Sequence, residues 1–133
     1  MDAVAAARAL IGTRFVAQGR NASRGVDCIG LVVNAFGLPA AEISDDYRMA
    51  GEHRAAILLA LSGRFRRVSR RRLRAGDLLL CRPGARQFHL MIWSGEGVIH
   101  ADARRRLVIE RPGAPEWPVV AAFRARIREK RGS

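Results

Sequence analysis

The sequence has few cysteines and no long apolar run, and each shortage excludes a class of protein. Its two cysteines, Cys28 and Cys81, are too few for a disulfide scaffold, and no Cys-x-x-Cys pair is present to begin a structural zinc site. A membrane-spanning helix needs about 18 consecutive apolar residues, and no stretch of the sequence is that long. The first residues lack the basic start and continuous apolar segment of a signal peptide. We therefore expect a protein that is made in the cytoplasm without membrane insertion, and that leaves the cell, if at all, by another route.

Lysine is nearly absent as well, because Lys130 is the only one, yet the formal net charge is +12. This arginine-derived charge is compatible with an anionic partner such as nucleic acid, a cell-wall polymer or a lipid headgroup, and equally with a solvated basic surface. The arginines gather modestly at 66–74, at 104–106 and at the C-terminus, and no aromatic residues are interleaved with them. A stacking platform for single-stranded nucleic acid is therefore not supported, and nucleic acid is a disfavoured partner.

The length and composition are those of one globular domain. The chain has 133 residues, of which 49% are hydrophobic and 27% charged, which suffices for a real core. We expect a single domain over residues 1–126, followed by a basic, flexible tail over 127–133.

The order of the expected elements indicates an α+β fold. Apolar spacing and glycine or proline stops favour N-terminal helices, and alternating or continuous apolar runs favour strands later in the chain. These helices are expected to pack on a central antiparallel sheet. The expected helices are 2–11, 27–36 and 53–61, with a polar loop at 13–26 and an irregular segment at 40–52, and the expected strands are 77–82, 88–93, 98–101, 107–110 and 118–126.

Two histidines lie in the segments on either side of a strong hairpin signal, Ser-Gly-Glu-Gly at 94–97. If the turn is centred between Gly95 and Glu96, Trp93 faces Val98 and His89 faces Asp102. His89 and His100 then become diagonal neighbours on one face of the hairpin, with Cβ atoms roughly 7 Å apart or less. A slip of one residue in register would place them on opposite faces.

Cys28 opens the second expected helix, with Asp27 as a good N-cap residue before it. A thiol at a helix start is placed for activation, because the free N–H groups and the helix dipole stabilise a thiolate. If this helix packs on the histidine face, Cys28 can act as a nucleophile, His89 as its base and His100 as the group that orients His89. Backbone N–H groups at the helix start, including that of Cys28, would bind the oxyanion.

Each of these residues also has an ordinary structural interpretation. A cysteine on a helix is usually a small buried apolar residue, and a histidine in a strand is more often structural than catalytic. A zinc site built from Cys28, His89 and His100 has suitable ligand types but no closely spaced ligand pair. Cys81 is interpreted as a core residue, His53 as surface decoration and Asp102 as a solvated loop-edge carboxylate.

Beyond these residues, an ordered set of motifs resembles the NlpC-type cell-wall peptidases, which are papain-like cysteine hydrolases. The resemblance covers about residues 5–110. It rests on Gly-Val-Asp-Cys-Ile-Gly-Leu-Val at 25–32, the preceding Ile-Gly-Thr-Arg-Phe at 11–15 and Gln-Gly-Arg at 18–20, Ala-Gly-Asp-Leu-Leu-Leu at 75–80, Phe-His-Leu-Met-Ile at 88–92 and Val-Ile-His-Ala at 98–101.

The resemblance implies a papain-like α+β fold, with Cys28, His89 and His100 as the catalytic set and no cofactor or metal. It implies hydrolysis of amide bonds in peptidoglycan stem peptides, typically between D-glutamate and a diamino acid. The compact chain without a signal sequence is most similar to the phage-tail and gene-transfer-agent branch, so tail or particle proteins are expected partners and the protein would act on the wall from such a particle.

Two positions depart from the common family pattern. Ile29 stands where many members have serine, and Phe15 stands where many have a tyrosine thought to assist the oxyanion. Gln18 is a candidate substitute for that tyrosine, and Asp27 is a candidate support residue. Two alternatives to a peptidoglycan peptidase stay open: a catalytically silent tail component with the same fold, and an acyltransferase or amidase acting on another substrate.

Overall fold

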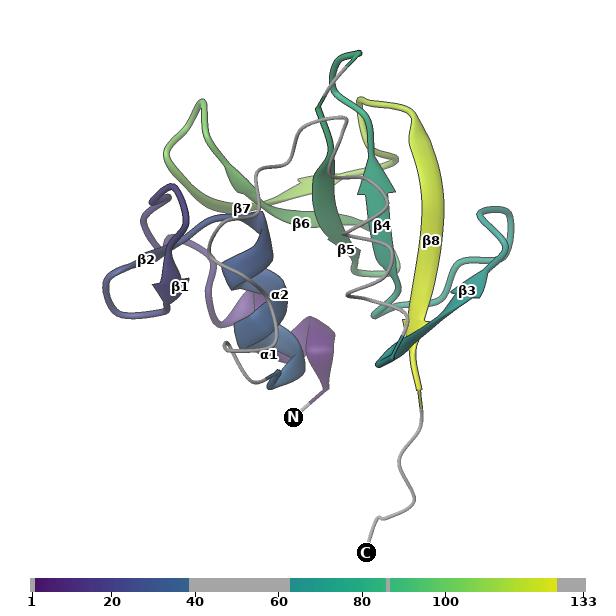
Figure 1. Cartoon of the computed structure of the whole chain (residues 1–133), viewed down its shortest axis with the longest axis horizontal. Helices are drawn as coiled ribbons and strands as arrows, with labels where there is room; N and C mark the ends of the chain where they lie inside the picture. The colour runs from purple at the N-terminus through teal and green to yellow at the C-terminus, as the bar shows by residue number, and fades with distance from the viewer. Residues whose placement is uncertain (1, 39–62, 86, 127–133) are drawn as a thin grey trace, which may run out of the picture.

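The computed structural model describes residues 2–38, 63–85 and 87–126. Figure 1 shows the helices beside a larger sheet, with a small two-stranded sheet next to them. The elements in chain order are α1 (Ala3–Arg8), β1 (Arg20–Asn21), β2 (Gly25–Val26), α2 (Cys28–Phe36), β3 (Phe65–Val68), β4 (Leu78–Cys81), β5 (His89–Trp93), β6 (Gly97–Asp102), β7 (Leu107–Pro112) and β8 (Val119–Ala125). The predicted segment 40–52, the predicted helix 53–61 with His53 and the predicted tail 127–133 lie outside the described residues.

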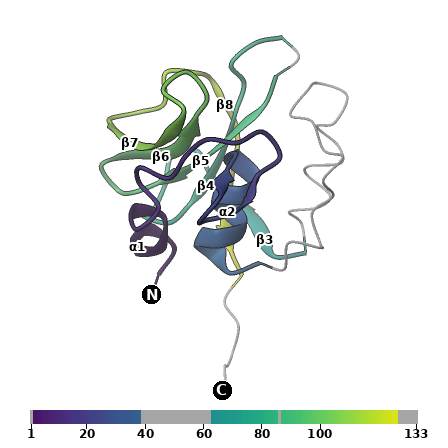
Figure 2. The same ribbon diagram turned by 90° about the vertical axis from the view of Figure 1, so that its left-hand side faces the viewer.

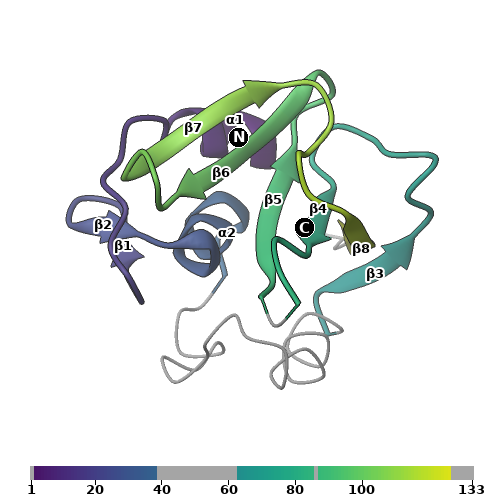
Figure 3. The same ribbon diagram turned by 90° about the horizontal axis from the view of Figure 1, so that it is seen from above.

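The main sheet has six antiparallel strands in the order β3-β8-β4-β5-β6-β7. Seen from above in Figure 3, α2 lies in the hollow of the curved sheet, between the β1–β2 pair and β5. Figure 2 shows α1 and α2 on the same side of the sheet. The predicted α+β class, with N-terminal helices on an antiparallel sheet, is confirmed.

The two faces of the sheet carry two separate hydrophobic clusters. Leu90 and Ile92 of β5 point toward α2 and pack with Cys28, Leu31 and their neighbours. The alternate residue Met91 points the other way, because successive side chains of a strand face opposite sides, and it packs with Cys81 and Trp117. The two cysteines therefore belong to different cores, on opposite faces of the sheet.

The hairpin between β5 and β6 has the predicted register. Trp93 pairs with Val98 and Ile92 with Ile99. Ser94 fixes the turn: its backbone N–H donates to the carbonyl of Gly97 at 2.8 Å, and its Oγ accepts from the backbone N–H of Gly97 at 3.0 Å. The register matters for the site, because it determines which face His100 occupies.

Three features differ from the sequence-based expectations. Residues 13–26 are not a plain loop, since they hold the β1–β2 pair, whose two-residue strands are too short to show any periodicity. The edge strand β3 was not predicted, although Phe65 is buried and Arg66 and Arg67 are exposed. Helix α1 ends at Arg8 rather than at residue 11, because the chain then tightens into turns before Gly12, which has a φ of 93°.

Candidate active site

The N-terminus of α2 is fixed by Asp27, as the sequence predicts. Its Oδ1 accepts a hydrogen bond from the backbone N–H of Gly30 at 2.8 Å, which satisfies one of the free donors of the first helical turn. The same carboxylate also holds the preceding segment. Oδ2 accepts from the backbone N–H of Gln18 at 3.0 Å, and Oδ1 accepts from Arg20 Nη1 at 2.8 Å. Asp27 therefore ties the chain at 18–20 to the start of the helix that carries Cys28.

Gln18 reaches this site through its backbone. Its φ is 61°, a left-handed conformation that is uncommon outside glycine, and the bond to Asp27 fixes its N–H there. The Gln18 side chain is exposed. The structure thus places Gln18 beside the helix start, while the predicted contribution of its side chain to an oxyanion hole stays a prediction.

Gly30 allows the 18–20 segment to lie directly against α2. A Cβ atom at Gly30 would stand 2.0 Å from the carbonyl oxygen of Gly19, a distance that real Cβ atoms do not adopt. The glycine in the Cys-Ile-Gly sequence is therefore required by the close approach of two backbones, and this approach keeps Gln18 and Arg20 within hydrogen-bonding distance of Asp27.

The Cys28 thiol lies at the start of α2 and is almost completely buried. The pKa of this thiol is raised to about 12, chiefly by burial and then by the neighbouring Asp27 carboxylate, while the backbone of Leu90, the Arg20 guanidinium and the backbone of Ile29 act to lower it. The helix start does lower the pKa of the thiol, through the backbone of Ile29, but this effect is too small to favour the thiolate in the resting protein. Desolvation outweighs the helix N-terminus.

The face on which α2 packs also differs from the expectation. The helix covers the face that carries Leu90, Ile92, Ile99 and Ala101, whereas the histidines alternate with these residues and rise from the other face. Ladder pairing between β5 and β6 is found at Trp93 and Ile92 and stops before His89. The two strands part there, and the backbone of Leu90, which lies within hydrogen-bonding reach of the Cys28 thiol, is next to His89 in the chain. The site therefore lies at the opening between β5 and β6.

His89 and His100 meet across this opening. His89 Nε2 and His100 Nδ1 are 2.9 Å apart, and the two rings stand edge to face with centroids 5.0 Å apart. This contact confirms the prediction from hairpin register. Because Nε2 of His89 is used by His100, Nδ1 is the nitrogen of His89 that is left to accept a proton from a thiol. No hydrogen bond joins His89 to Cys28 in this part of the structure.

Both imidazoles are neutral at pH 7. The pKa of His89 is lowered to about 3, chiefly by burial and then by the neighbouring His100, while Asp102 acts to raise it. Burial also lowers the pKa of His100, while Asp102 and Glu116 raise it. The resting site therefore holds an uncharged thiol and an uncharged histidine pair rather than a preformed thiolate–imidazolium pair.

Asp102 is not the solvated carboxylate that its loop-edge position suggests. Its side chain is 14% exposed and accepts hydrogen bonds from the backbone N–H groups of Arg104 at 2.8 Å and Arg105 at 3.0 Å. Burial raises the pKa of Asp102, but these N–H groups and the nearby His100 lower it more, and the net pKa is below its usual range. An ionised carboxylate thus faces His100 at the end of β6.

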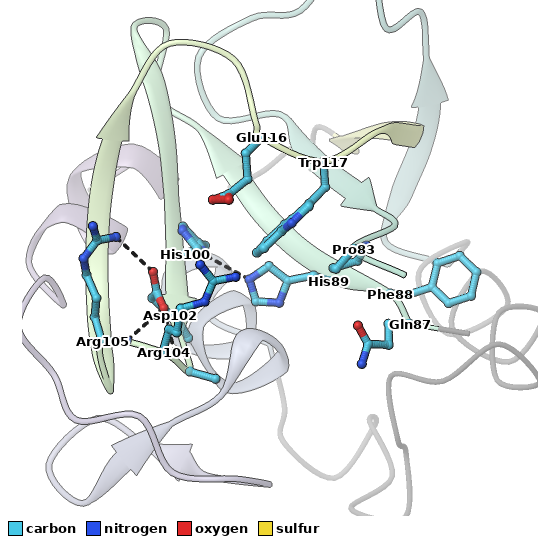
Figure 4. A pocket seen from close by; sticks show the side chains of 12 residues that line it. Pro83, Gln87, Phe88, His89, His100, Asp102, Arg104, Arg105, Glu116 and Trp117 are labelled. Carbon is cyan, nitrogen blue, oxygen red and sulfur yellow. Dashed lines mark hydrogen bonds and ion pairs between the residues drawn. The ribbon is translucent and has the colours of Figure 1, made fainter. Parts of the chain in front are cut away.

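An open cleft of about 760 Å³ leads to the histidine pair. Figure 4 shows Trp117 lying over both imidazole rings, with arginines on one wall and Glu116 near the rim. The Trp117 ring stands edge to face against His89 at 5.4 Å and against His100 at 6.1 Å between centroids. Cys28 does not line this cleft. The lining residues are Pro83, Gln87, Phe88, His89, His100, Ala101, Asp102, Ala103, Arg104, Arg105, Glu116 and Trp117.

Sequence reasoning missed Trp117 and Arg20. Trp117 comes from the connection before β8, and the only local signal is an aromatic residue between two prolines, Pro115 and Pro118. Arg20 stands in the segment before the nucleophile motif, where one arginine among many carries no distinguishing pattern. Both residues reach the site through tertiary contacts alone.

Within the described ranges, no group of three or more histidine, cysteine, aspartate or glutamate side chains is arranged to hold a metal ion. The two histidines direct their facing nitrogens at one another. Among the same residues, no helix is long and apolar enough to cross a membrane.

The fold and this arrangement define a class: papain-like α+β domains with a cysteine at a helix start and histidines on the facing strands. A sequence profile described as the NlpC/P60 family matches residues 12–121. The chain belongs to the NlpC/P60 family. No curated protein matches it significantly.

Solved structures agree with this assignment. The chain is similar to the NlpC/p60 domain of the peptidoglycan hydrolase SagA, with 25% identity, a TM-score of 0.59 and coverage of 83% of this chain and 86% of the other. NlpC1 from Trichomonas vaginalis has a TM-score of 0.68 at 17% identity, covering 92% of this chain and 42% of that one. The peptidoglycan hydrolase RipB from Mycobacterium tuberculosis has a TM-score of 0.59 at 21% identity, covering 92% and 61%. This chain therefore spans less than half of the Trichomonas protein.

Proposed function

We propose that this protein is a cysteine hydrolase that cleaves amide bonds in peptidoglycan stem peptides. The observation that carries the proposal is the histidine pair, His89 Nε2 to His100 Nδ1 at 2.9 Å, at the opening where the Cys28 thiol meets the backbone of β5. Membership of the NlpC/P60 family and the likeness to two peptidoglycan hydrolases support the substrate class.

In the proposed mechanism, Cys28 is the nucleophile and His89 the general base. Nδ1 of His89 takes the thiol proton as the sulfur attacks the amide carbonyl carbon, and the imidazolium then protonates the departing amine. Water hydrolyses the resulting thioester and regenerates the thiol. Nδ1 of His100 accepts the Nε2–H of His89, which keeps the lone pair on Nδ1, and Asp102 stabilises positive charge on the histidine pair.

The neutral resting site suits this sequence of steps. Since burial raises the pKa of Cys28 and lowers that of His89, proton transfer accompanies attack instead of preceding substrate binding. Backbone N–H groups at the start of α2 bind the developing oxyanion, because the first N–H groups of a helix lack intrahelical partners. Gln18 and Asp27 support this region, Asp27 through its three hydrogen bonds and Gln18 through the backbone position that Asp27 holds.

At a finer level, we propose that the bond cleaved joins D-glutamate to a diamino acid, and that the protein is delivered with a phage-tail or gene-transfer particle. The motif resemblance supports both statements. Arg104 and Arg105 on the cleft wall suit a substrate that carries carboxylates.

The decisive experiment compares the wild-type protein with Cys28→Ala on purified sacculi, with products identified by mass spectrometry. We expect wild-type protein to release peptides with a new diamino-acid N-terminus and Cys28→Ala to release none, while both bind the wall and melt at similar temperatures. Cys81→Ala is the matched control for loss of a buried thiol, because Cys81 packs in the other core cluster; since it pairs with His89 in the sheet, its rate can fall, but cleavage should persist. Binding by wild-type protein without any released product would instead indicate a silent structural component.

A further inference from the structure

Arg20 is buried in a way that its surroundings do not fully satisfy. Its side chain is 10% exposed and pairs with Asp27 through Nη1 at 2.8 Å, and the same nitrogen donates to the carbonyl of Gly19 at 3.1 Å. Its Nε and Nη2 are buried without a hydrogen-bond partner in the described part of the chain. A buried guanidinium with two unused donors is costly, and such a group in a native site calls for a functional explanation.

The position of Arg20 supplies that explanation. Asp27 is needed as the helix cap and as the anchor of Gln18, but its negative charge stands next to Cys28 and opposes formation of a thiolate. The positive charge of Arg20 lowers the pKa of the same thiol and so favours the thiolate. An Asp27 carboxylate without a positively charged partner would therefore disfavour formation of the Cys28 thiolate.

We propose that Arg20 is a positioning residue for Cys28: its buried guanidinium holds the Asp27 carboxylate and offsets that charge beside the sulfur as the thiolate forms. The inference deepens the proposed function, on which it rests. Arg20 acts through the field at sulfur and through Asp27, and it touches neither the cleft nor the histidine pair.

The charged and titratable groups that face Cys28 are few in the described structure. From its own helix start and the adjoining segment they are Asp27 and Arg20. The nearest titratable groups of β5 and β6 are His89 and His100, which rise from the other face of the sheet and whose pKa values are lowered. Within residues 2–38, 63–85 and 87–126, the formal charges that act on the thiol are thus the two partners of the ion pair.

The test measures the rate at which iodoacetamide alkylates Cys28, in a Cys81→Ala background, between pH 7 and 10. Below the thiol pKa this rate follows the thiolate fraction, so it reports on the sulfur without any substrate. Arg20→Met should lower the rate about tenfold at each pH, which corresponds to a rise of about one pKa unit. Arg24→Met is the matched control, since Arg24 is exposed on the same β1–β2 turn, and it should leave the rate unchanged.

Two further variants separate charge from packing. Arg20→Lys keeps the charge and should retain most of the rate, and Arg20→Met combined with Asp27→Asn removes both charges and should restore it toward the parent value. Asp27→Asn alone should raise the rate, which keeps the proposal testable if Arg20→Met does not fold. Equal rates for Arg20→Met and Arg24→Met, or no recovery in the double variant, would overturn the proposal.

Cleavage of sacculi by the same proteins is recorded separately. If the parent protein shows the predicted alkylation pattern but releases no peptide, the proposed hydrolase function fails and the role of Arg20 stands. If the parent cleaves but alkylation does not respond to Arg20 or Asp27, the role of Arg20 fails and the hydrolase function stands.

Discussion

Cys28 and Cys81 are both buried thiols, and burial raises the pKa of each to about 12. What separates them is their surroundings. Burial alone shifts the pKa of Cys81, whereas the pKa of Cys28 also depends on Asp27, Arg20 and the backbone of Leu90. The resting pKa therefore does not identify the nucleophile. The nucleophile is identified instead by its position at a helix start, within reach of a strand that carries a histidine.

His100 gives a residue-scale prediction. The residue is 2% exposed, and its Nδ1 lies 2.9 Å from Nε2 of His89, where in the proposed mechanism it accepts the Nε2 proton. His100→Ala should lower kcat roughly 10²-fold to 10³-fold with little change in KM, because the substrate is bound but the base is in the wrong tautomer or orientation. Steady-state kinetics on a soluble muropeptide measure both constants.

His100→Gln is the matched comparison, since its side-chain oxygen can replace the acceptor. We expect a smaller loss of kcat for His100→Gln than for His100→Ala. Equal losses in the two variants would mean that His100 acts through packing under Trp117 rather than through its hydrogen bond to His89.

At the scale of elements, α2 depends on the close approach permitted by Gly30. In Gly30→Ala the new Cβ would collide with the carbonyl of Gly19, so either the 18–20 segment or the helix must shift. We expect a loss of about 1–3 kcal/mol in the free energy of unfolding, measured with urea, and a parallel loss of activity. Gly63→Ala is the control, because a Cβ there meets nothing within 4 Å, and its stability should be close to that of the wild-type protein. An unchanged Gly30→Ala protein would show that the two backbones are not held together.

The elements also show what a sequence can and cannot predict. The bounds of α2 and the register of the β5–β6 hairpin were predictable, because a capping aspartate, a closing glycine and a short glycine turn are local signals. The separation of β5 from β6 beyond Ile92 was not predictable, because the end of backbone pairing between two strands does not change the pattern of apolar and polar side chains. The packing of α2 on the face opposite the histidines was missed for the same reason.

Within the site, the three chemically reactive residues were recognisable by type and spacing. Cys28 opens a helix, and His89 and His100 fall on one hairpin face. Trp117 and Arg20 were not recognisable, because each acquires its meaning from a contact between segments far apart in the chain or from burial that only the fold creates.

For the whole molecule, burial of neutral histidines makes stability depend on pH. The folded-state pKa of His89 is about 3, against an ordinary value of 6.5, and that of His100 is also lowered. Between these two pKa values the unfolded chain binds more protons than the folded one. The stability contributed by the neutral histidines is therefore fully present above about pH 6.5, and this contribution is lost as the pH falls toward 3. His89 alone accounts for a loss of up to about 3 kcal/mol by pH 4, at about 1.4 kcal/mol per pKa unit.

Thermal melts between pH 8 and pH 4 check this expectation. The wild-type Tm should fall below about pH 6.5, and a His89→Gln, His100→Gln variant should fall less steeply over the same range, because it has no buried imidazole to protonate. Parallel curves for the two proteins would mean that carboxylates, and not the histidine pair, set the acid sensitivity.

The molecule as a whole places its site between two cores. Cys28 belongs to the cluster between α2 and the sheet, and the histidines border the cluster that contains Trp117 and Cys81. A loss of packing on either face of the sheet therefore changes one side of the site, and catalytic competence reports on the integrity of both cores.

The turn between β5 and β6 has a consequence for how the chain can vary in length. Ser94 closes it with bonds to both backbone groups of Gly97, and this closure aligns Trp93 with Val98. One residue gained or lost between Trp93 and Gly97 would turn every later side chain of β6 over, moving His100 to the far face of the sheet. Homologous chains that keep the histidine pair should therefore conserve the length of this turn, even where its exposed residue Glu96 is replaced, and should place their insertions elsewhere.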